Sequence, residues 1–312
     1  MRAIEFREFG DFSRLHLVER PDPHATPDTA VVRVHAASVN MSDAKNIGGR
    51  MKQTTLPRIP GRDYSGVVVE GPADFVDASV WGTGGDVGLT RDGTHAEYIE
   101  VPRASLVRKP RHISHEEAAS LGVTFLTAWI GVVEYARLAA GETLAVIGAG
   151  GGVGGAAIQI GKSLGARAIA IDRRPLPADS PAAKLADVRI ESTADLGAAG
   201  KADVVFDTAG GSMFQTALGL LAHRGRLIEI SGKDPVSLNI VDFYHNESQL
   251  LSVDSLKRDL TASAKVLREL AAGFERGVFV APLIAKVLPL EEAREAYRLV
   301  VEGQTGRVVL RP

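Results

Sequence analysis

The sequence predicts an α/β protein of two domains, one irregular and β-rich and the other built on a doubly wound parallel sheet. The chain has 312 residues, whereas a typical domain has about 100–200. Short β-branched runs separated by turn residues dominate its first third. From Ser114 onward, strand-like and helix-like segments alternate, as a parallel sheet covered by helices requires.

The composition is that of an ordinary globular chain and excludes several functions. Lys and Arg number 36 against 38 Asp and Glu, so no excess of cations is available to neutralise nucleic-acid phosphates. The chain has no Cys, which excludes disulfides, thiolate nucleophiles, iron–sulfur clusters and Cys-bound zinc. The first residues lack the apolar core of a signal peptide, and no apolar run is long enough to span a bilayer. We therefore expect a cytoplasmic protein without a nucleic-acid or membrane partner.

The first domain is expected over residues 1–113 and consists of short extended segments. Ala30–Ala36 and Gly66–Glu70 are β-branched runs, and stretches that contain Pro, Gly and Asp separate them. Tyr98–Pro102 continues the pattern. These segments predict an irregular, barrel-like β domain.

The second domain is expected over residues 114–277. It opens with a capping box, in which the Ser114 hydroxyl and the Glu117 carboxylate satisfy free N–H groups at a helix start. The helical pattern then continues to about Tyr135. The strands predicted after it are Thr143–Ile147, Ala168–Ile171, Asp203–Asp207, Arg226–Ile230 and Leu250–Val253. The helices predicted between them are Ala156–Leu164, Met213–Leu221 and Leu260–Phe274.

The β pattern returns after Gly277. Strands are predicted at Val278–Ala281, Ile284–Pro289 and Arg307–Leu310, around one helix that starts near Leu290 with acids in its first turn. We therefore expect residues 278–312 to return to the first domain.

The most informative segment joins the strand Thr143–Ile147 to a helix through the glycine-rich turn Gly148–Gly155. In a dinucleotide-binding βαβ unit the glycines permit a sharp turn, let the backbone approach the pyrophosphate and let helix and strand pack closely. The pyrophosphate then lies on free N–H groups at the helix start. The next strand is followed by Asp172, 18 residues after Gly154, near the offset of about 20 at which an acid meets the adenosine ribose. The segment therefore predicts dinucleotide binding.

The tripeptide Asp172-Arg173-Arg174 leaves the choice of nicotinamide cofactor open. The carboxylate favours NADH, because it would bond a ribose 2′-hydroxyl and repel a 2′-phosphate. The two guanidiniums favour NADPH, because they would pair with that phosphate. Alternatively, the two Arg side chains are simply solvated at a strand end and have no role in binding. Since two Arg outnumber one Asp, we favour NADPH and keep NADH as the alternative.

Five further segments occur in a fixed order along the chain. They are Ala37–Asp43, which ends in Asn-x-x-Asp; Ile59–Val68, with Pro-Gly-x-acid-x-x-Gly-Val; Gly93–Tyr98, with Ala-Glu-Tyr; Leu121–Trp129, with Leu-Thr-Ala; and Thr305–Leu310, with Gly-basic-x-Val. In this order they resemble the medium-chain dehydrogenase/reductase superfamily, and within it the zinc-free quinone oxidoreductase branch. The resemblance covers nearly the whole chain.

The resemblance implies a GroES-like β-barrel catalytic domain and a Rossmann cofactor domain, with the active site in the cleft between them. It sets the fingerprint as Ala149-Gly150-Gly151-Gly152-Val153-Gly154, with Ala where the general pattern has Gly, as the branch often has. Zinc-dependent members hold their metal with Cys and His at the places matched here by Asn40 and Arg62, so we expect no zinc. The pair His112 and His115 straddles the predicted helix start and is not expected to hold a metal.

Without a metal to polarise a carbonyl, the chemistry that is left is direct hydride transfer to an acceptor that is already electrophilic. Quinones and α,β-unsaturated carbonyl compounds qualify, because the developing negative charge is delocalised onto oxygen. We therefore expect a zinc-independent, NADPH-dependent reductase of a small quinone or enone. From the resemblance we also expect a homodimer that pairs through the edge strand near Leu250–Val253.

Two residues are candidates for catalysis. Asn40 would donate a hydrogen bond to the developing oxyanion or orient the nicotinamide amide, and its alternative role is to cap a turn. Thr127 would bond the nicotinamide region, and its alternative is a bond to its own helix backbone. No side chain stands out as the proton donor.

The resemblance places further residues near the cofactor. Thr208 closes a strand on the adenosine side, Ser231 ends the next strand, Phe243 and Tyr244 follow in a loop near the nicotinamide, and Arg307 is the late basic residue. Thr208, the aromatic pair and Arg307 also have a structural interpretation: a strand-to-helix turn for Thr208, core packing for the aromatic pair and solvation for Arg307. The complete predicted cofactor set is Ala149, Gly150, Gly151, Gly152, Val153, Asp172, Arg173, Arg174, Thr208, Ser231, Phe243, Tyr244 and Arg307.

Two rival functions stay open. One is an enoyl-thioester reductase, for which Asp172-Arg173-Arg174-Pro175 is a mild hint; it would consume NADPH with an enoyl-thioester and little with quinones. The other is a nucleotide sensor or structural protein that kept the cofactor fold and lost turnover, since a fold does not guarantee chemistry. It would bind NADPH without oxidising it.

Overall fold

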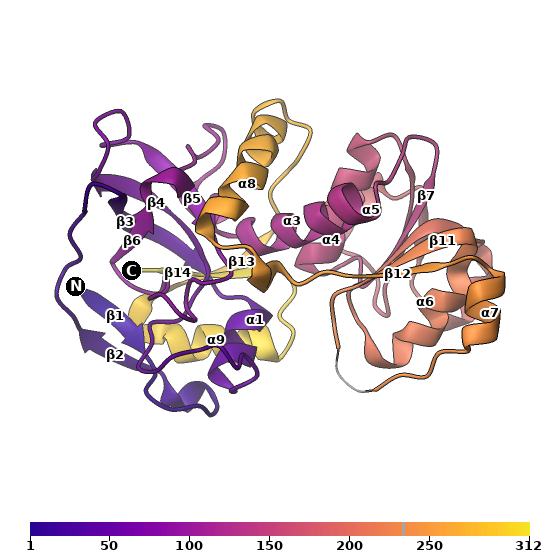
Figure 1. Ribbon diagram of the computed structural model, residues 1–312, viewed down its shortest axis with the longest axis horizontal. Coiled ribbons are helices and arrows are strands. Elements are labelled where there is room, and N and C mark those ends of the chain that lie inside the picture. The colour runs from indigo at the N-terminus through magenta and orange to yellow at the C-terminus, as the bar shows by residue number, and fades with distance from the viewer. Residues whose placement is uncertain (233–234) are drawn as a thin grey trace. The chain divides into compact units, whose positions relative to one another are not determined.

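The computed structural model describes residues 1–232 and 235–312, and its contacts divide the chain into two compact units (Figure 1). Unit 1 comprises residues 1–126, 255–277 and 281–312. Unit 2 comprises residues 127–254 and 278–280.

Unit 1 is built on a mixed sheet with β3 at its centre. The sheet has the order β13-β14-β3-β4-β5, and β6 also pairs with β3. Neighbouring strands are antiparallel, except that β13 and β14 are parallel. A two-stranded antiparallel sheet, β1 with β2, accompanies it. The strands are β1 (Arg2–Glu5), β2 (His16–Glu19), β3 (Thr29–Ser38), β4 (Asp63–Glu70), β5 (Ser79–Thr83), β6 (Tyr98–Pro102), β13 (Ile284–Pro289) and β14 (Arg307–Arg311).

The helices of unit 1 are short apart from α8. They are α1 (Met41–Ile47), α2 (His115–Ala119), α8 (Leu260–Glu275) and α9 (Ala293–Val301), with 3-10 turns η1 (Phe12–Arg14), η2 (Arg103–Ser105), η6 (Ser255–Lys257) and η7 (Leu290–Glu292). Helix α3 (Gly122–Trp129) begins in unit 1 and ends in unit 2. The predicted capping box is confirmed, because Ser114 Oγ accepts from Glu117 N at 3.1 Å and Glu117 Oε2 accepts from Ser114 N at 2.7 Å.

Unit 2 is a parallel sheet in the order β12-β11-β10-β7-β8-β9. Counted within the unit from β9, this is the order 3-2-1-4-5-6 of a doubly wound nucleotide-binding sheet. The order reverses between β7 and β10, and in such sheets the ligand crevice lies at this reversal. The strands are β7 (Thr143–Ile147), β8 (Arg167–Ile171), β9 (Val188–Ile190), β10 (Ala202–Asp207), β11 (Leu221–Glu229) and β12 (Gln249–Ser252).

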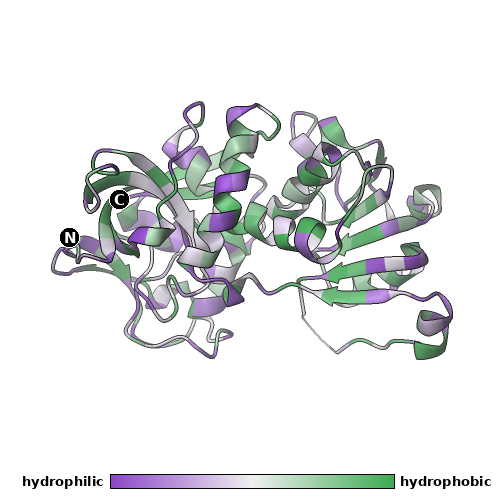
Figure 2. Cartoon of the chain, turned by 45° about the horizontal axis from the view of Figure 1, so that its top comes forward, coloured by the Kyte–Doolittle hydropathy of each residue, from purple (hydrophilic) through white to green (hydrophobic). Residues whose placement is uncertain are grey.

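Helices follow the strands of unit 2, and the strands themselves are largely hydrophobic (Figure 2). The helices are the π-helical segment η3 (Ile130–Tyr135), α4 (Gly152–Ser163), α5 (Pro181–Leu185), α6 (Phe214–Leu220) and α7 (Ile240–His245), with 3-10 segments η4 (Thr193–Ala199) and η5 (Gly211–Met213). Val205 and Leu227 of the sheet pack with Phe214 and Ala217 of α6 in one buried core. The predicted fold class, with its β-rich and parallel-sheet parts, is confirmed.

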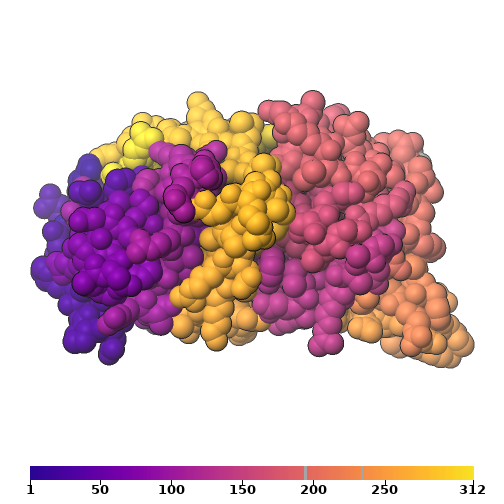
Figure 3. Space-filling view, turned by 90° about the horizontal axis from the view of Figure 1, so that it is seen from above, coloured from indigo at the N-terminus to yellow at the C-terminus, as the bar shows by residue number. Residues whose placement is uncertain are grey.

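The predicted helix Leu260–Phe274 exists as α8, and it groups with unit 1 instead of with the parallel-sheet unit. The reason is aromatic packing, since the Phe274 ring lies 6.2 Å from that of Trp81 and 5.1 Å from that of Phe125, measured between centroids. Arg268 also donates to the Ala104 carbonyl at 2.9 Å, where α8 lies beside η2 (Figure 3). The contact division thus differs from the predicted boundaries after residues 113 and 277, because residues 114–126 and 255–277 group with unit 1.

The predicted strand Val278–Ala281 is wrong, because this segment forms no strand. The Gln159 side chain satisfies the backbone of Val280 instead, with Oε1 accepting from its N–H at 2.8 Å and Nε2 donating to its carbonyl at 3.2 Å. The glutamine side chain therefore makes the hydrogen bonds that a neighbouring strand would make in a sheet. Residues 278–280 consequently group with unit 2.

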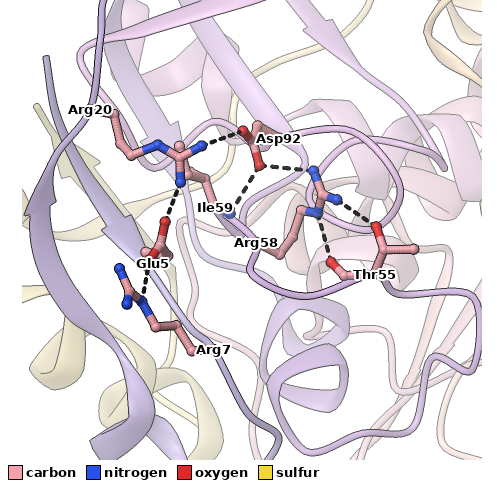
Figure 4. A network of polar contacts seen from close by, with 7 residues as sticks. All are labelled: Glu5, Arg7, Arg20, Thr55, Arg58, Ile59 and Asp92. Atoms are coloured by element: carbon pink, nitrogen blue, oxygen red, sulfur yellow. Dashed lines mark hydrogen bonds and ion pairs between the residues drawn. The ribbon is translucent and has the colours of Figure 1, made fainter.

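A network of charged side chains ties β1 and β2 to two later loops of unit 1 (Figure 4). Buried Glu5 accepts from Arg7 and Arg20, and Asp92 pairs with Arg20 at 3.7 Å and with Arg58 at 2.8 Å. A buried carboxylate needs such partners, so the network fixes the start of the chain on the loops. Among the described residues, no helix is long and apolar enough to cross a membrane.

Candidate active site

The glycine-rich turn follows β7 and begins α4, as the sequence predicts. A side chain at Gly154 would place its Cβ 2.2 Å from the Gly148 carbonyl oxygen, so the helix approaches the turn more closely than any other residue permits. Gly148 itself has a φ of +78°, which favours glycine. These two positions explain why this turn needs glycine.

The turn leaves a row of backbone donors at the start of α4. Gly148 and Ala149 both donate to the Ile171 carbonyl, so their amides are engaged. The first bond within the helix runs from Gly155 N to Gly151 O at 2.8 Å. The N–H groups of Gly152, Val153 and Gly154 therefore have no acceptor among the described residues. Such a row, at the positive end of the helix dipole, fits the pyrophosphate of a dinucleotide.

Asp172 is anchored to this turn. Its carboxylate accepts from Gly150 N at 2.9 Å and from Arg174 N at 3.3 Å. A preference for NADPH would most simply require the Asp172 side chain to point away from the glycine turn. These two bonds instead keep it at the turn. The side chains of Arg173 and Arg174 are exposed and make no hydrogen bond or ion pair within the described part of the chain. Both guanidiniums are thus available to an anion.

The ends of β10 and β11 hold the next predicted residues. Thr208 donates its hydroxyl proton to the Ile147 carbonyl at 2.8 Å, so it serves the turn geometry and can only accept from a ligand. Buried Asp207 accepts from Ala209 N and Gly210 N at 2.8 and 2.9 Å. Ser231 donates its backbone N–H to Glu229 Oε1 at 3.0 Å.

Glu229 is a residue that sequence reasoning missed. It is the register partner of Asp207 on the neighbouring strand, and burial, together with the charge of Asp207, raises its pKa to about 7. Glu229 Oε2 and Asp207 Oδ2 are both buried without a hydrogen-bond partner among the described residues. The sequence signal was an acid within the apolar run of the predicted strand Arg226–Ile230, where a hydrophobic residue is ordinary.

Phe243 and Tyr244 lie in helix α7, so their predicted placement in a loop is wrong. Asn239 starts this helix, because its Oδ1 accepts from Val241 N at 3.1 Å. Tyr244 is 58% exposed and its ring lies 4.2 Å from that of His245, between centroids. Core packing therefore does not describe Tyr244.

Thr127 differs from the other threonine of α3. Thr124 donates its hydroxyl proton to the Leu121 carbonyl at 3.0 Å, which is the local bond expected of a helical threonine. Thr127 is 6% exposed, and its hydroxyl makes no such bond within the described residues. Its hydroxyl is therefore free to bond a ligand.

Asn40 belongs to a buried polar cluster of unit 1, which we define as Ser38, Asn40, Asp43, Arg62, Asp63 and Arg307. The amide of Asn40 donates to Asp63 Oδ2 at 3.0 Å and accepts from Arg307 at 2.6 Å. Arg307 also donates to Ser38 Oγ at 2.8 Å. The Asn40 amide is therefore held in one orientation by the Asp63 carboxylate and the Arg307 guanidinium, and one of its two amide hydrogens stays available. Arg307 is partly buried in this cluster, so solvation does not describe it.

Electrostatics of the cluster are set by burial. Burial raises the pKa of Asp63, against the hydrogen bond from Asn40 and the charges of Arg307 and Arg62, and raises that of Asp43 to about 7. Asp63 Oδ1 also accepts from Val123 N at 2.9 Å, which joins the cluster to the start of α3. Asp63 and Asp43 were not among the predicted site residues, although both lie in motifs that the sequence displays.

The residues at the family's zinc positions do not fit that metal. Asn40 presents an amide and Arg62 a guanidinium, whereas zinc is bound by Cys, His or a carboxylate. Arg62 is buried and donates Nε to the Gly84 carbonyl at 2.9 Å. In the described part of the chain, no three His, Cys, Asp or Glu side chains are grouped to hold a metal. His115 bonds Ser65 Oγ through Nδ1 at 2.8 Å.

Two family models match the chain. Residues 26–111 match the alcohol dehydrogenase GroES-like domain, and residues 181–310 match the zinc-binding dehydrogenase model. The second match does not include Asn40 or Arg62.

Relatives and solved structures agree with these models. The chain is 33% identical to a zinc-type alcohol dehydrogenase-like protein of Schizosaccharomyces pombe over 93% of this chain and 90% of the relative. It is 27% identical to human quinone oxidoreductase over 99% and 97%. A solved NAD-dependent alcohol dehydrogenase superposes with a TM-score of 0.89 at 30% identity, and the quinone oxidoreductase of Thermus thermophilus, solved also with NADPH, with 0.79 at 29%. Each of these two alignments covers 100% of both chains.

Proposed function

Since the chain belongs to the medium-chain dehydrogenase/reductase superfamily of oxidoreductases, we propose that it is a zinc-independent NADPH-dependent reductase of quinones or α,β-unsaturated carbonyl compounds. The observation that carries the proposal is the polar cluster around Asn40. It places an oriented amide and a buried guanidinium where zinc-dependent relatives need metal ligands. An acceptor that needs no Lewis acid follows from that composition.

The glycine turn fits the nucleotide. The unpartnered N–H groups of Gly152, Val153 and Gly154 bind the pyrophosphate, and the close approach at Gly154 keeps side chains out of its way. When bound, NADPH supplies the hydride and the protein supplies its orientation. Thr127, with its free hydroxyl, bonds the nicotinamide region.

The preference for NADPH rests on Arg173 and Arg174. Their exposed guanidiniums have no partner among the described residues and pair with a 2′-phosphate. Asp172 opposes this preference, because its carboxylate stays at the turn. Its carboxylate accepts hydrogen bonds from Gly150 N and Arg174 N, which partly compensate its negative charge. We therefore keep NADPH as the favoured cofactor.

Asn40 stabilises the acceptor oxygen in this proposal. Its carbonyl accepts from Arg307 and one amide hydrogen is donated to Asp63, so the remaining amide hydrogen has a fixed direction. A donor that is oriented before the reaction stabilises developing charge more than a mobile one. Arg307 and Asp63 are then positioning residues, which act through Asn40.

A steady-state assay with an acceptor panel tests the function. The purified protein is given NADPH or NADH with quinones, enones and enoyl-thioesters, in metal-free buffer and again with added zinc. We expect saturable NADPH oxidation with a quinone or enone that zinc does not stimulate. Turnover confined to enoyl-thioesters would identify the rival reductase, and NADPH binding without any oxidation would identify a sensor. Turnover that requires zinc would overturn the proposal.

We also propose that two copies pair through the edge of the parallel sheet. Strand β12 lies at the end of the strand order and exposes Leu250 at 46%. Ile240 and Tyr244 of α7 are 61% and 58% exposed. Exposed apolar side chains beside an open edge favour association. Sedimentation should show a dimer that Leu250→Lys weakens, and a monomeric parent protein would refute the pairing.

A further inference from the structure

A cavity of about 480 Å³ opens on unit 1, and the proposed function does not use it. Its size is within the range of about 300–1,000 Å³ of small-molecule sites. It is lined by Arg33 and His35 of β3, by His115 and Glu116 at the start of α2, and by Arg311 of β14. Glu97 and Tyr98 at the start of β6, Val34 of β3 and Pro312 after β14 complete its lining.

Strand geometry gathers the basic groups on one face. Val32 and Val34 of β3 are buried in the core of unit 1, so the alternating residues Arg33 and His35 share the opposite face. Helix α2 packs on β3, and the His115 ring lies 4.6 Å from the His35 ring, between centroids. Two imidazoles and a guanidinium therefore line the same space.

The two acidic side chains of the cavity are already paired. Glu97 accepts from Arg2 Nε at 2.9 Å and from Arg2 N at 2.7 Å. Glu116 accepts from Arg311. Neither carboxylate needs a cation or a donor from a ligand.

The polar side chains of the cavity that stay unsatisfied are mainly donors. Within the described residues, the Arg33 guanidinium makes no ion pair or hydrogen bond, and neither do the Tyr98 hydroxyl and the His35 ring nitrogens. A guanidinium has five N–H groups and no acceptor, and each neutral imidazole has one N–H. A ligand that satisfies this cavity must therefore bring acceptors, and beside an unpaired guanidinium it must bring negative charge.

His115 can contribute a further donor to the cavity if its ring takes up a proton. Ser65 Oγ donates to the Val80 carbonyl at 2.9 Å, so its 2.8 Å contact with His115 Nδ1 is made by the Nδ1–H of the ring. Nε2 of neutral His115 is then an acceptor, and it becomes a donor only when the ring takes up a proton.

We propose that this cavity binds a compact oxyanion, the phosphate or carboxylate group of a small effector, and that binding adds a proton to the His35–His115 pair. The anion pairs with Arg33 and supplies the negative charge that the imidazolium needs. The site lies within unit 1, and its occupant is distinct from the nicotinamide nucleotide of the proposed function.

The charges around the two rings set the direction of the coupling. Burial, helped by the charges of His35 and Lys109 and opposed by Glu116, lowers the pKa of His115 to about 4. Burial, helped by Arg33 and opposed by Glu116, also lowers the pKa of His35. An anion beside the rings reverses these effects and raises both pKa values. Anion affinity must therefore rise as the pH falls.

Calorimetric titration with sulfate tests the site, because sulfate keeps its charge over the whole pH range used. Arg33→Gln removes the guanidinium, and Arg103→Gln is the matched control. Arg103 is exposed in unit 1, outside the cavity, and its side chain makes no hydrogen bond or ion pair among the described residues. We expect Arg33→Gln to weaken sulfate binding by about tenfold or more and Arg103→Gln to leave it unchanged. Equal affinities in the two variants would overturn the site.

The proton is tested by repeating the titration between about pH 7.5 and about pH 5.5, with ring nitrogen shifts followed by NMR. We expect affinity to rise at least about threefold at the lower pH, and His35→Gln to reduce that rise. Affinity that depends on Arg33 but not on pH would overturn the proton uptake.

Two further arms identify the occupant. Glycerol phosphate is compared with inorganic phosphate: tighter binding of the ester assigns the site to an organic effector, and equal binding assigns it to the free anion. NADPH affinity should be the same in Arg33→Gln as in the parent. A matching loss of NADPH and sulfate binding would show that the cavity belongs to the nucleotide, which overturns the separate site.

Discussion

The glycine turn of unit 2 and the polar cluster of unit 1 recognise ligands in opposite ways. The turn offers backbone N–H groups, which Gly152–Gly154 present because the helix starts there. The cluster offers the side-chain amide of Asn40, held between Asp63 and Arg307. The turn is one continuous segment, whereas the cluster joins residues separated by up to 269 positions.

The two regions therefore respond differently to substitution. A backbone site is destroyed when a side chain enters its space, and the identity of most neighbouring side chains matters little. A side-chain site keeps its fold when one group is trimmed and loses the orientation of the groups that remain. Substitutions in the turn should therefore affect nucleotide affinity and folding, and substitutions in the cluster should affect turnover.

Gly154→Ala against Gly155→Ala should give the largest effect. The new Cβ at residue 154 would lie 2.2 Å from the Gly148 carbonyl oxygen, whereas at residue 155 the nearest atom is 3.7 Å away. We expect Gly154→Ala to lower the free energy of unfolding by about 1–3 kcal/mol and to abolish measurable NADPH binding. Gly155→Ala should be stable, since alanine favours a helix. Denaturant unfolding measures the stability and titration measures NADPH binding of each variant. Equal stability and equal NADPH affinity in the two variants would contradict binding by the backbone of this turn.

Asn40→Ala should give the next largest effect. It removes the group that Asp63 and Arg307 orient, so we expect kcat to fall by about a hundredfold while the NADPH dissociation constant stays unchanged. Asn46→Ala is the control, because Asn46 is also buried in unit 1 but donates to the Gly88 carbonyl. It should lower stability and spare kcat. A fall in NADPH affinity with Asn40→Ala would erase the contrast between the two regions.

Replacing both Arg173 and Arg174 by Ala should change the preference between NADPH and NADH. Two exposed guanidiniums without partners among the described residues are lost, so the NADPH dissociation constant should rise about tenfold more than that of NADH. Asp172→Asn is the converse variant and should improve NADPH binding. Fluorescence titration with each nucleotide measures the ratio. Equal changes for both nucleotides would remove the basis for a preference.

Asp43→Asn should give the smallest effect and is visible only as a function of pH. Burial, with the charge of Asp63, raises the pKa of Asp43 to about 7 from an ordinary value of 3.8. Protonated Asp43 therefore contributes stability below about pH 4, and this contribution is lost as the pH rises through about 7. The Tm of Asp43→Asn, relative to the parent, should rise with pH over this range. A constant difference would contradict the buried acid.

Sequence patterns foresaw the regions that are continuous along the chain. The strands β7 and β10, the glycine turn and the capping box at Ser114 were predicted because periodicity, turn residues and caps are local signals. The turn could be assigned to a dinucleotide because its binding groups are backbone N–H groups. Their arrangement follows from the spacing of the glycines in the sequence.

Contacts between distant segments were not foreseeable. Asp63 bonds both Asn40 and Val123, and the spacing of these residues along the sequence does not predict that they are in contact. Helix α8 follows the strands of the parallel sheet in sequence, yet Phe274 packs on Trp81 in unit 1. At Val280 a glutamine side chain replaced the strand that the β-branched pattern predicted. In each case a tertiary contact decided what local propensity had left open.

The most direct test of the account is NADPH titration of Gly151→Asp beside Gly151→Asn. Residue 151 precedes the free amides, has an ordinary φ of −78°, and a Cβ there would contact only the Gly148 carbonyl oxygen, at 3.3 Å. The two variants have side chains of the same shape and differ by one negative charge. We expect the Asp variant to bind NADPH at least about tenfold more weakly than the Asn variant, with equal Tm values. Equal NADPH affinity in the two variants would contradict a pyrophosphate at this turn.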